Sequence, residues 1–262
     1  MSFSPASKDA APDLAEAHAE VMGRVAAAAE RSGRKADDVL VVAVSKYAEL
    51  DQLRTLVDLG HVDFGENQVQ QLAQRAPQLA EYLSRQRAMR GASSTKDAVP
   101  DRVRWHMIGH LQRNKVKQCV PHAQLVHSVD SLRLAEELHN HGNKHDLDTD
   151  VLVQVNVSGE KSKGGVVPAA VVHLLEQMDS MMHLRCRGLM TMAPHHEDPE
   201  QTRGVFARTR ELFEDCRASR WAGGRFNVLS MGMSNDFEVA IEEGANLVRI
   251  GSALFGAKPP SA

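Results

Sequence analysis

The chain has 262 residues, of which 42% are hydrophobic and 25% are charged, so it is long enough for one large core or for two smaller domains. Its formal net charge of -3 gives no reason to expect nucleic acid or an anionic membrane as a partner. The first residues lack a basic segment followed by an apolar run, and no window approaches roughly 18 consecutive apolar residues. We therefore expect a cytoplasmic protein whose three cysteines, which lack CxxC spacing, stay reduced.

The predicted elements alternate along the chain after a flexible tail over residues 1–12. An alanine-rich segment at 13–33 has helical spacing, and Gly33 ends it. Short runs rich in Val, Leu and Ile predict strands at 39–45, 62–65, 103–108, 124–128, 150–156, 184–190, 226–231 and 246–250. Amphipathic segments predict helices between them, at 49–59, 67–83, 112–119, 130–142, 167–180, 199–218 and 235–243.

This alternation indicates the fold class. Eight strands that alternate with helices favour a parallel sheet, and eight is the number that closes a (β/α)8 barrel. The segment at 13–33 would be an extra N-terminal helix, and the barrel domain would span residues 13–258. An open, doubly wound sheet is the alternative, although no GxGxxG motif follows the first strand.

Residues 84–101 interrupt the alternation because they are polar and carry no periodicity. We predict an exposed, mobile insertion between the second of the intervening helices and the third strand. A helix-to-strand loop lies on the N-terminal face of a barrel, whereas active sites lie on the opposite face. The insertion is therefore not where we expect the functional site.

Two turns rich in glycine and serine follow the last two predicted strands. Gly232 and Ser234 precede a predicted helix, with Ser234 or Asn235 as its N-cap, and Gly251 and Ser252 precede a short apolar helical turn. Backbone N–H groups at such turns bind anions, and barrels often bind phosphate with the loops after strands seven and eight. Together the turns favour a phosphate site, whereas each alone is compatible with ordinary helix capping.

Two cationic residues lie close to these turns in the predicted barrel. Lys46 ends the first strand, and closure of the barrel places that strand beside the eighth, so its amine can lie near a bound phosphate. A Schiff-base lysine beside a phosphate site suggests pyridoxal phosphate or a phosphorylated sugar, and the alternative is a lysine that reaches solvent. Arg249 either points outward or faces the ligand, and periodicity does not decide between these.

Several blocks of sequence resemble the YggS/PROSC family of pyridoxal 5'-phosphate homeostasis proteins. They occur in order from about residue 35 to 257 and read VAVSKYAEL, DFGENQVQQL, WHMIGHLQRNK, VHSVDSLRLAEEL, VLVQVNVSGEKSKGGV, LRCRGLMTMAP and LSMGMSNDFEVAIEEGANLVRIGSALFG. The resemblance implies a single barrel like the N-terminal domain of alanine racemase. Asn235 departs from the family pattern, which commonly has an aspartate there, and the insertion at 84–101 is longer than usual.

The resemblance also implies a cofactor and a set of site residues. Lys46 would hold pyridoxal 5'-phosphate (PLP) as a Schiff base, and Arg249 would face the pyridine nitrogen. Lys163 falls where the family carries a second lysine linked with cofactor handling. The other residues implied to lie at the cofactor are Asn67 beside it, Ser234, Gly251 and Ser252 in the phosphate cradle, and Ser230 and Met233 alongside.

The tyrosines argue for a carrier and against an enzyme. A racemase needs a second acid or base on the far face of the cofactor, commonly a tyrosine. Tyr47 should point away from Lys46 by strand alternation, and Tyr82 precedes the insertion. We therefore expect a monomeric PLP-binding protein without catalytic activity of its own, which acts in PLP homeostasis and supplies apo-enzymes.

Two other functions remain open at this stage. One is a PLP-dependent amino-acid racemase of low activity that uses His110 or Lys163 as the missing base. The other is a Schiff-base aldolase without a cofactor, which fits the lysine and the phosphate turns but not the family pattern. The adjacent His195 and His196 lack an evident third ligand, so we expect no metal site.

Overall fold

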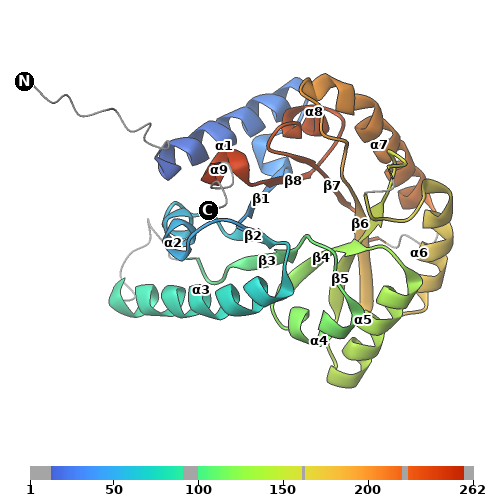
Figure 1. Ribbon diagram of the computed structural model, residues 1–262, viewed down its shortest axis with the longest axis horizontal. Helices are drawn as coiled ribbons and strands as arrows, with labels where there is room; N and C mark the ends of the chain where they lie inside the picture. Colours follow the sequence, from blue (N-terminus) through green and yellow to red (C-terminus); the bar gives the residue numbers. More distant parts are fainter. Residues whose placement is uncertain (1–12, 91–99, 161–162, 220–223, 257–262) are drawn as a thin grey trace, which may run out of the picture.

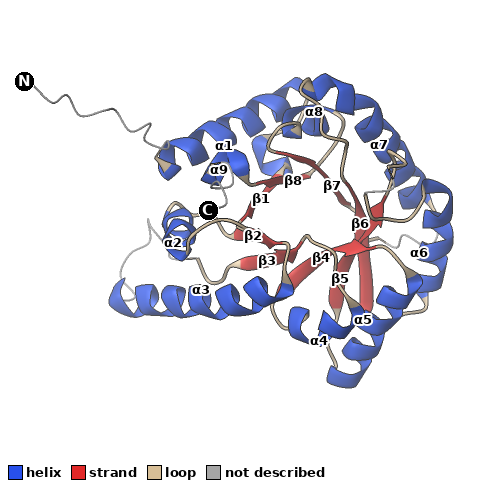
Figure 2. Ribbon diagram, in the orientation of Figure 1, coloured by secondary structure: helices blue, strands red, loops and turns tan. Residues whose placement is uncertain are grey.

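A closed barrel of parallel strands forms the centre of the computed structural model, which describes residues 13–90, 100–160, 163–219 and 224–256. Helices surround the barrel (Figures 1 and 2). The strands are β1 (Leu40–Val44), β2 (Asp63–Glu66), β3 (Arg104–Met107), β4 (Ala123–Val129), β5 (Thr149–Val155), β6 (Leu184–Thr191), β7 (Val228–Met233) and β8 (Leu247–Ile250). The described helices are α1 (Leu14–Arg31), α2 (Leu50–Asp58), α3 (Val69–Arg90), α4 (Val116–Cys119), α5 (Leu132–His145), α6 (Val171–Asp179), α7 (Arg203–Ala218), α8 (Phe237–Glu242) and α9 (Ser252–Phe255).

Pairing of the first strand with the last closes the barrel. β1 runs parallel to β8, with Leu40 opposite Leu247 and Ala43 opposite Ile250. The predicted barrel is therefore confirmed, and the open sheet is excluded because its edge strands would remain unpaired. Closure also brings the segment after Val44 beside the segment after Ile250, as the sequence argument required.

Side chains on both faces of the strands are buried, which explains the nearly unbroken apolar runs in the sequence. Val41 and Ala43 point toward the helices and join the large outer core, whereas Val42 points into the barrel. The apolar part of the interior is small, and its buried residues are Val42, Leu125, Leu152, Met190 and Leu247. The rest of the interior contains buried polar groups.

The predicted N-terminal helix is α1. Asp13 caps it by accepting a hydrogen bond from the backbone N–H of Ala15 at 3.2 Å, and Gly33 follows its end with a φ of +72°. Its apolar face, which includes Val21 and Val25, is buried, and it packs against α8 and α9 (Figure 1). In the described parts of the chain, no helix is long and apolar enough to cross a bilayer.

The insertion predicted at 84–101 is partly wrong. α3 continues to Arg90, so residues 84–90 are helical. Leu83 is the last large apolar side chain that anchors this helix, at 1% exposed, and the following turn presents polar side chains to solvent. An i,i+4 ion pair between Glu81 and Arg85, at 2.5 Å, supports that turn. Residues 91–99 lie outside the described part of the chain, as do the predicted tail at 1–12 and the last residues of the 13–258 domain.

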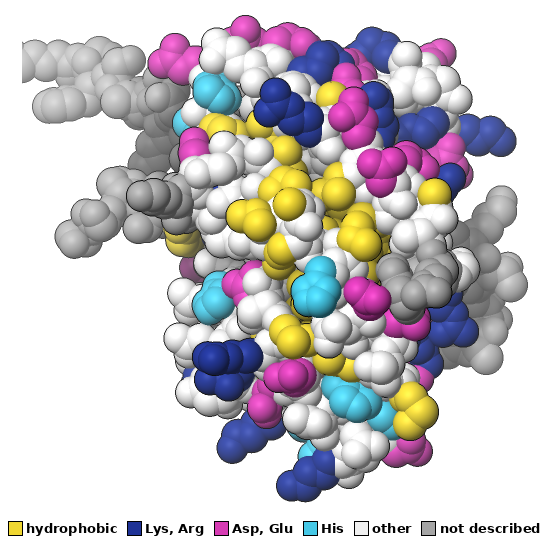
Figure 3. All heavy atoms as spheres, turned by 90° about the vertical axis from the view of Figure 1, so that its right-hand side faces the viewer, with side chains coloured by type: hydrophobic (Ala, Val, Ile, Leu, Met, Phe, Trp, Pro, Cys, Tyr) yellow, Lys and Arg dark blue, Asp and Glu magenta, His cyan; other side chains and the backbone are white. Residues whose placement is uncertain are grey.

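The face of the molecule in Figure 3 carries acidic and basic side chains around a group of apolar ones. Two apolar side chains are also exposed near this face, Val167 at 60% and Val172 at 43%. The mixture of signs agrees with the small net charge of the whole chain.

Candidate functional site

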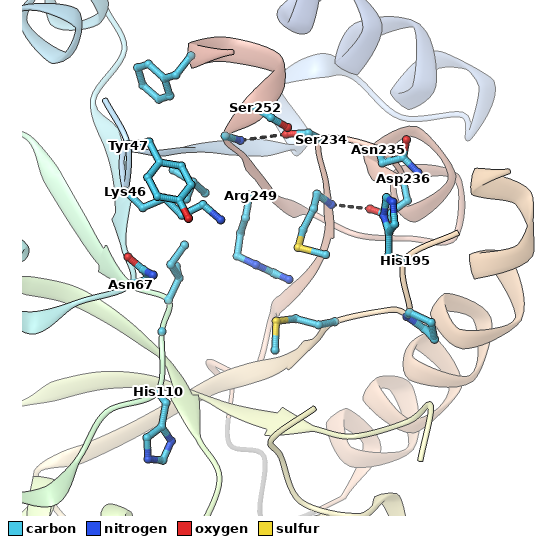
Figure 4. Close-up of a pocket in the computed structure, with 18 of the residues that line it drawn as sticks. Lys46, Tyr47, Asn67, His110, His195, Ser234, Asn235, Asp236, Arg249 and Ser252 are labelled. Carbon is cyan, nitrogen blue, oxygen red and sulfur yellow. Dashed lines mark hydrogen bonds between the residues drawn. The ribbon is translucent and has the colours of Figure 1, made fainter. Parts of the chain in front are cut away.

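A cavity of about 900 Å³ opens at the carboxyl ends of the strands, which is the face where barrels place their sites. Side chains at or just beyond the end of each of the eight strands line it, and they include Val44, Asn67, Ile108, Asp130, Gln154, Met192, Met233 and Arg249. Figure 4 shows how the labelled side chains surround it. The cavity brings together most of the residues that the sequence predicted, namely Lys46, Asn67, Met233, Ser234, Arg249, Gly251 and Ser252.

Lys46 lies in the turn that follows β1. The strand ends at Val44, Ser45 is buried, and Lys46 itself is exposed where it lines the cavity. Its Nζ lies 5.1 Å from the centre of the Tyr47 ring, and Tyr47 lines the same cavity (Figure 4). The prediction that Tyr47 points away is therefore wrong, because strand alternation stops at Val44 and does not extend into the turn.

An arginine on α3 holds the Lys46 turn from behind. Arg75 donates one hydrogen bond to the carbonyl of Ser45 at 2.5 Å and another to the carbonyl of Ala48 at 2.6 Å. It also forms an ion pair with Glu66 at 2.6 Å, and the Ser45 hydroxyl donates to the same carboxylate at 2.7 Å. Burial raises the pKa of Glu66, while Ser45 and Arg75 oppose that rise. The backbone on both sides of Lys46 is thus fixed by a buried charge pair that sequence analysis did not find.

Arg249 forms the floor of the cavity. Its side chain points inward and is 4% exposed, which answers the question that periodicity left open. Nη1 donates to the hydroxyl of Ser230 at 2.6 Å, and Nη2 donates to the carbonyl of Thr191 at 2.8 Å. Burial lowers the pKa of Arg249 to about 10, against the opposing charge of Asp236, so the guanidinium is still protonated at neutral pH. Ser230 is fully buried beneath the cavity and supports Arg249 from there.

The two glycine and serine turns are joined to each other. The hydroxyl of Ser234 accepts hydrogen bonds from the backbone N–H groups of Gly251, at 3.1 Å, and Ala253, at 3.3 Å (Figure 4). Gly232 has a φ of +92°, and a Cβ there would lie 2.6 Å from the Cβ of Ala240, so only glycine fits. The two loops therefore form one connected, closely packed surface.

The prediction that Ser234 or Asn235 caps α8 is wrong. The N-cap position is Asp236, whose carboxylate accepts a hydrogen bond from the backbone N–H of Met233 at 2.6 Å. The side chain of Asn235 donates instead to the carbonyl of His196 at 2.8 Å. Because Asp236 already bonds the β7 loop to itself through the Met233 N–H, the Ser234 hydroxyl is not used as a cap and bonds to the turn after β8 instead.

The walls of the cavity also carry histidines and a further carboxylate. His110 Nδ1 lies 3.3 Å from Asp130 Oδ2, and His195 and His196 line the cavity on the β6 side. Within the described ranges, no group of three or more His, Cys, Asp or Glu side chains is placed to hold a metal ion. Asp130 was not predicted because the loop after its strand lacks a motif with one chemical meaning. The sequence suggested His110 only as a possible base, and His195 and His196 only as a pair without a third metal ligand.

Lys163 lies in the loop after β5, beside the cavity. Its neighbour Gly164 lines the cavity, whereas Lys163 is not one of the described lining residues. The backbone of Lys163 is held in place, because its N–H donates to Glu160 and its carbonyl accepts from the Asn156 side chain at 2.9 Å.

Comparison with known proteins identifies the class of barrel. A family model described as the alanine racemase N-terminal domain matches residues 11–259. The alanine racemase of Clostridium difficile is similar in fold, with a TM-score of 0.64 and 15% identity, over 97% of this chain and 60% of that one. The barrel is thus of the alanine racemase type.

More similar relatives define the family within this class. The pyridoxal phosphate homeostasis protein of Aquifex aeolicus is 38% identical to this chain, over 90% of this chain and 94% of its own length. That of Pseudomonas aeruginosa is 37% identical, over 94% of this chain and 96% of its own length. The structure of PipY from Synechococcus elongatus with PLP bound has a TM-score of 0.75 and 29% identity, over 93% of this chain and all of that one. The chain therefore belongs to the family of pyridoxal phosphate homeostasis proteins.

Proposed function

We propose that this protein binds PLP reversibly, as a Schiff base on Lys46, and supplies it to apo-enzymes as part of PLP homeostasis in the cytoplasm. The observation that carries the proposal is the meeting of the Lys46 amine, the Arg249 guanidinium and the linked Ser234–Gly251 turns in one cavity. We also propose that the protein acts as a monomer, which light scattering after gel filtration would test.

The residues present fit this cofactor. PLP supplies an aldehyde that condenses with a primary amine and releases water. Lys46 provides the amine, and the hydroxyls of Ser234 and Ser252 suit a phosphate. Asn67 and Met233 lie along the wall. A cavity of about 900 Å³ is within the usual size range of small-molecule sites.

Arg249 favours holding the cofactor over using it in catalysis. A guanidinium only donates hydrogen bonds and keeps its proton at neutral pH, so beside the pyridine nitrogen it would leave that nitrogen unprotonated. An unprotonated ring is a weak electron sink. Arg249 would therefore contribute to affinity and orientation while limiting the ability of the site to stabilise a carbanion.

Borohydride reduction tests the covalent part of the proposal. We expect reduction of the PLP-loaded protein to fix the pyridoxyl group on the peptide that contains Lys46, as identified by mass spectrometry. Lys46→Ala should lose the absorbance of the bound cofactor, whereas Lys163→Ala should keep it. A label on Lys163 alone, or no label on any lysine, would overturn the assignment of Lys46.

A transfer assay tests the supply role separately. The PLP-loaded protein is mixed with an apo-enzyme in the presence of a phosphatase that destroys free PLP. If the protein hands over the cofactor directly, the apo-enzyme will regain activity faster than it does in a control that contains the same amount of free PLP and the same phosphatase. Recovery no faster than from free PLP would limit the function to storage.

A low-activity racemase is the second candidate, and the His110–Asp130 pair is the observation that favours it. A carboxylate 3.3 Å from a cavity-lining imidazole is the arrangement of a general base and its orienting partner. If this function is present, amino acids incubated with the loaded protein in D2O will exchange their α-proton, and His110→Ala will abolish the exchange. Retention of the α-proton at high protein concentration would exclude it.

A further inference from the structure

A chain of hydrogen bonds crosses the barrel interior from the floor of the cavity to its opposite end. It runs from Arg249 Nη1 to Ser230 Oγ at 2.6 Å, and from Ser230 Oγ to His127 Nδ1 at 3.1 Å. It continues from His127 Nε2 to His106 Nδ1 at 3.0 Å, and from His106 Nε2 to Asp63 Oδ1 at 3.2 Å. All five side chains belong to residues that are 5% exposed or less.

The Asp63 carboxylate sets the direction of the bonds when each imidazole carries one hydrogen. Arg249 can only donate, so Ser230 Oγ accepts from it and has one hydrogen left to give to His127 Nδ1. His127 then carries its proton on Nε2 and donates to His106 Nδ1, which leaves His106 to donate from Nε2 to Asp63. The opposite direction would turn a lone pair of His106 toward the Asp63 carboxylate.

Asp63 is an ionised acceptor at the far end. Arg104 donates to it twice, from Nε at 2.7 Å and from Nη2 at 2.5 Å. Burial raises the pKa of Asp63, but the hydrogen bonds from Arg104 and His106 outweigh burial and keep that pKa below its usual value. Burial also holds the pKa of His127 well below its usual value, so this histidine is neutral.

Arg249 depends on this chain because neutral acceptors hold it. In the parts of the chain that the structure describes, no carboxylate forms an ion pair with its guanidinium, which is bonded to the Ser230 hydroxyl and the Thr191 carbonyl. Each link polarises the next, so the Asp63 carboxylate strengthens Ser230 as an acceptor through the two histidines. Without this chain the hydrogen of the Ser230 hydroxyl would have no fixed acceptor, and the oxygen that accepts from Arg249 would be less polarised and less firmly placed.

We propose that His127, His106 and Asp63 are positioning residues that orient Arg249 toward the bound cofactor. They accept the hydrogen of the Ser230 hydroxyl and polarise its oxygen, and so set the position and strength of the acceptor that holds the guanidinium. The inference rests on the proposed PLP binding for its effect on affinity, whereas the proton positions can be measured without the cofactor.

The proton positions are measured on unaltered, cofactor-free protein. Long-range proton–nitrogen correlation spectra of protein labelled with ¹⁵N-histidine report which ring nitrogen carries hydrogen. We expect both His106 and His127 to carry hydrogen on Nε2 and none on Nδ1. Hydrogen on Nδ1 of either ring, or a doubly protonated His106, would overturn the proposal whether or not the protein binds PLP.

The effect on the site is measured with PLP as the probe. We expect His127→Phe and Asp63→Asn each to raise the Kd for PLP by about tenfold and to shift its absorbance maximum. In the first variant the Ser230 hydroxyl loses the acceptor for its hydrogen, and in the second the chain loses the carboxylate that polarises it. His127→Gln, which can still accept from Ser230 and donate to His106, should recover part of the affinity. Wild-type Kd and spectrum in both His127→Phe and Asp63→Asn would refute the positioning role.

Thr209→Val is the matched control. It removes a buried hydroxyl that donates to the Val205 carbonyl within α7, outside this chain of bonds. It should destabilise the fold to a measurable extent but leave the Kd and spectrum of PLP unchanged. A change as large as that in His127→Phe would show that loss of stability alone accounts for the effect and would overturn the inference.

Discussion

Replacing Arg75 with methionine should destabilise the protein strongly, because it leaves the Glu66 carboxylate buried without its charge partner. Glu66 is 0% exposed and the Arg75 side chain is 17% exposed, so water cannot replace the lost interaction. The substitution also removes the two hydrogen bonds that hold the carbonyls of Ser45 and Ala48.

The size of the effect follows from this burial. Removing one partner of a buried ion pair costs about 3–5 kcal/mol in the free energy of unfolding. In a protein of this length that corresponds to a fall in Tm of about 10 °C. Glu66→Gln in the Arg75→Met background should recover at least half of the lost stability, because it removes the unpaired charge and still accepts from Ser45.

The loss should depend on pH. Burial places the pKa of Glu66 in the folded protein above its unfolded value, and loss of Arg75 raises it further. Between those two pKa values the folded state binds more protons than the unfolded state, so stability falls as the pH rises through that window. The Arg75→Met protein should therefore be least impaired near about pH 5 and most impaired near about pH 8.

Urea unfolding followed by circular dichroism at both pH values measures these differences. A loss below about 1 kcal/mol for Arg75→Met would refute the view that this ion pair braces the Lys46 turn. So would a loss that is the same at both pH values, or one that Glu66→Gln does not reduce.

Three further predictions concern the cavity itself. Ser234→Ala should weaken PLP binding by about tenfold and the binding of pyridoxal, which lacks the phosphate, by less than about twofold, as measured by fluorescence titration. Gly232→Ala should lower the free energy of unfolding in urea by about 2–4 kcal/mol, because the φ of Gly232 is +92° and a Cβ there would lie 2.9 Å from the Phe237 backbone. Gly251→Ala is the comparison: the atom nearest to its Cβ would be 3.3 Å away, so the loss should be under about 1 kcal/mol. The losses in PLP-binding free energy caused by Arg75→Met and Ser230→Ala should add to within about 0.5 kcal/mol in the double variant, since no described contact links their networks. A larger difference between the double variant and the sum of the single variants would show that the two networks communicate.

The sequence was enough to predict the barrel and the face that carries the cavity, and the reason is geometric. Parallel strands in a barrel end on one face, so any residue just after a predicted strand is a candidate for the site. Lys46, Gly251 and Ser252 could be placed there without knowledge of a single distance. The same rule failed for Tyr47, because it depends on where the strand ends, and β1 stops three residues before it.

The supporting residues could not be predicted because their roles depend on three-dimensional proximity. Arg75 is one of many polar residues on a long helix, and no local pattern indicates that its side chain reaches back to the turn after β1. His106 and His127 lie on apolar strands. Because side chains alternate between the two faces of a strand, a shift of one residue decides whether each imidazole faces the helices or the barrel interior. The pairing of β3 with β4 contains a register shift, so the face on which each histidine lies cannot be read from the sequence.

The two cations of the cavity are held by separate networks, and this separation fits reversible binding. The turn that carries Lys46 is fixed from outside the barrel, through Arg75 and the Glu66 carboxylate. Arg249 is fixed from inside, through Ser230 and the histidines that lead to Asp63. Because Lys46 itself remains exposed at the mouth while Arg249 is buried at the floor, the proposed Schiff base would form and break at the solvent edge. The hydrogen bonds of the floor would stay the same throughout, so the proposed release of the cofactor would require no rearrangement of the buried network.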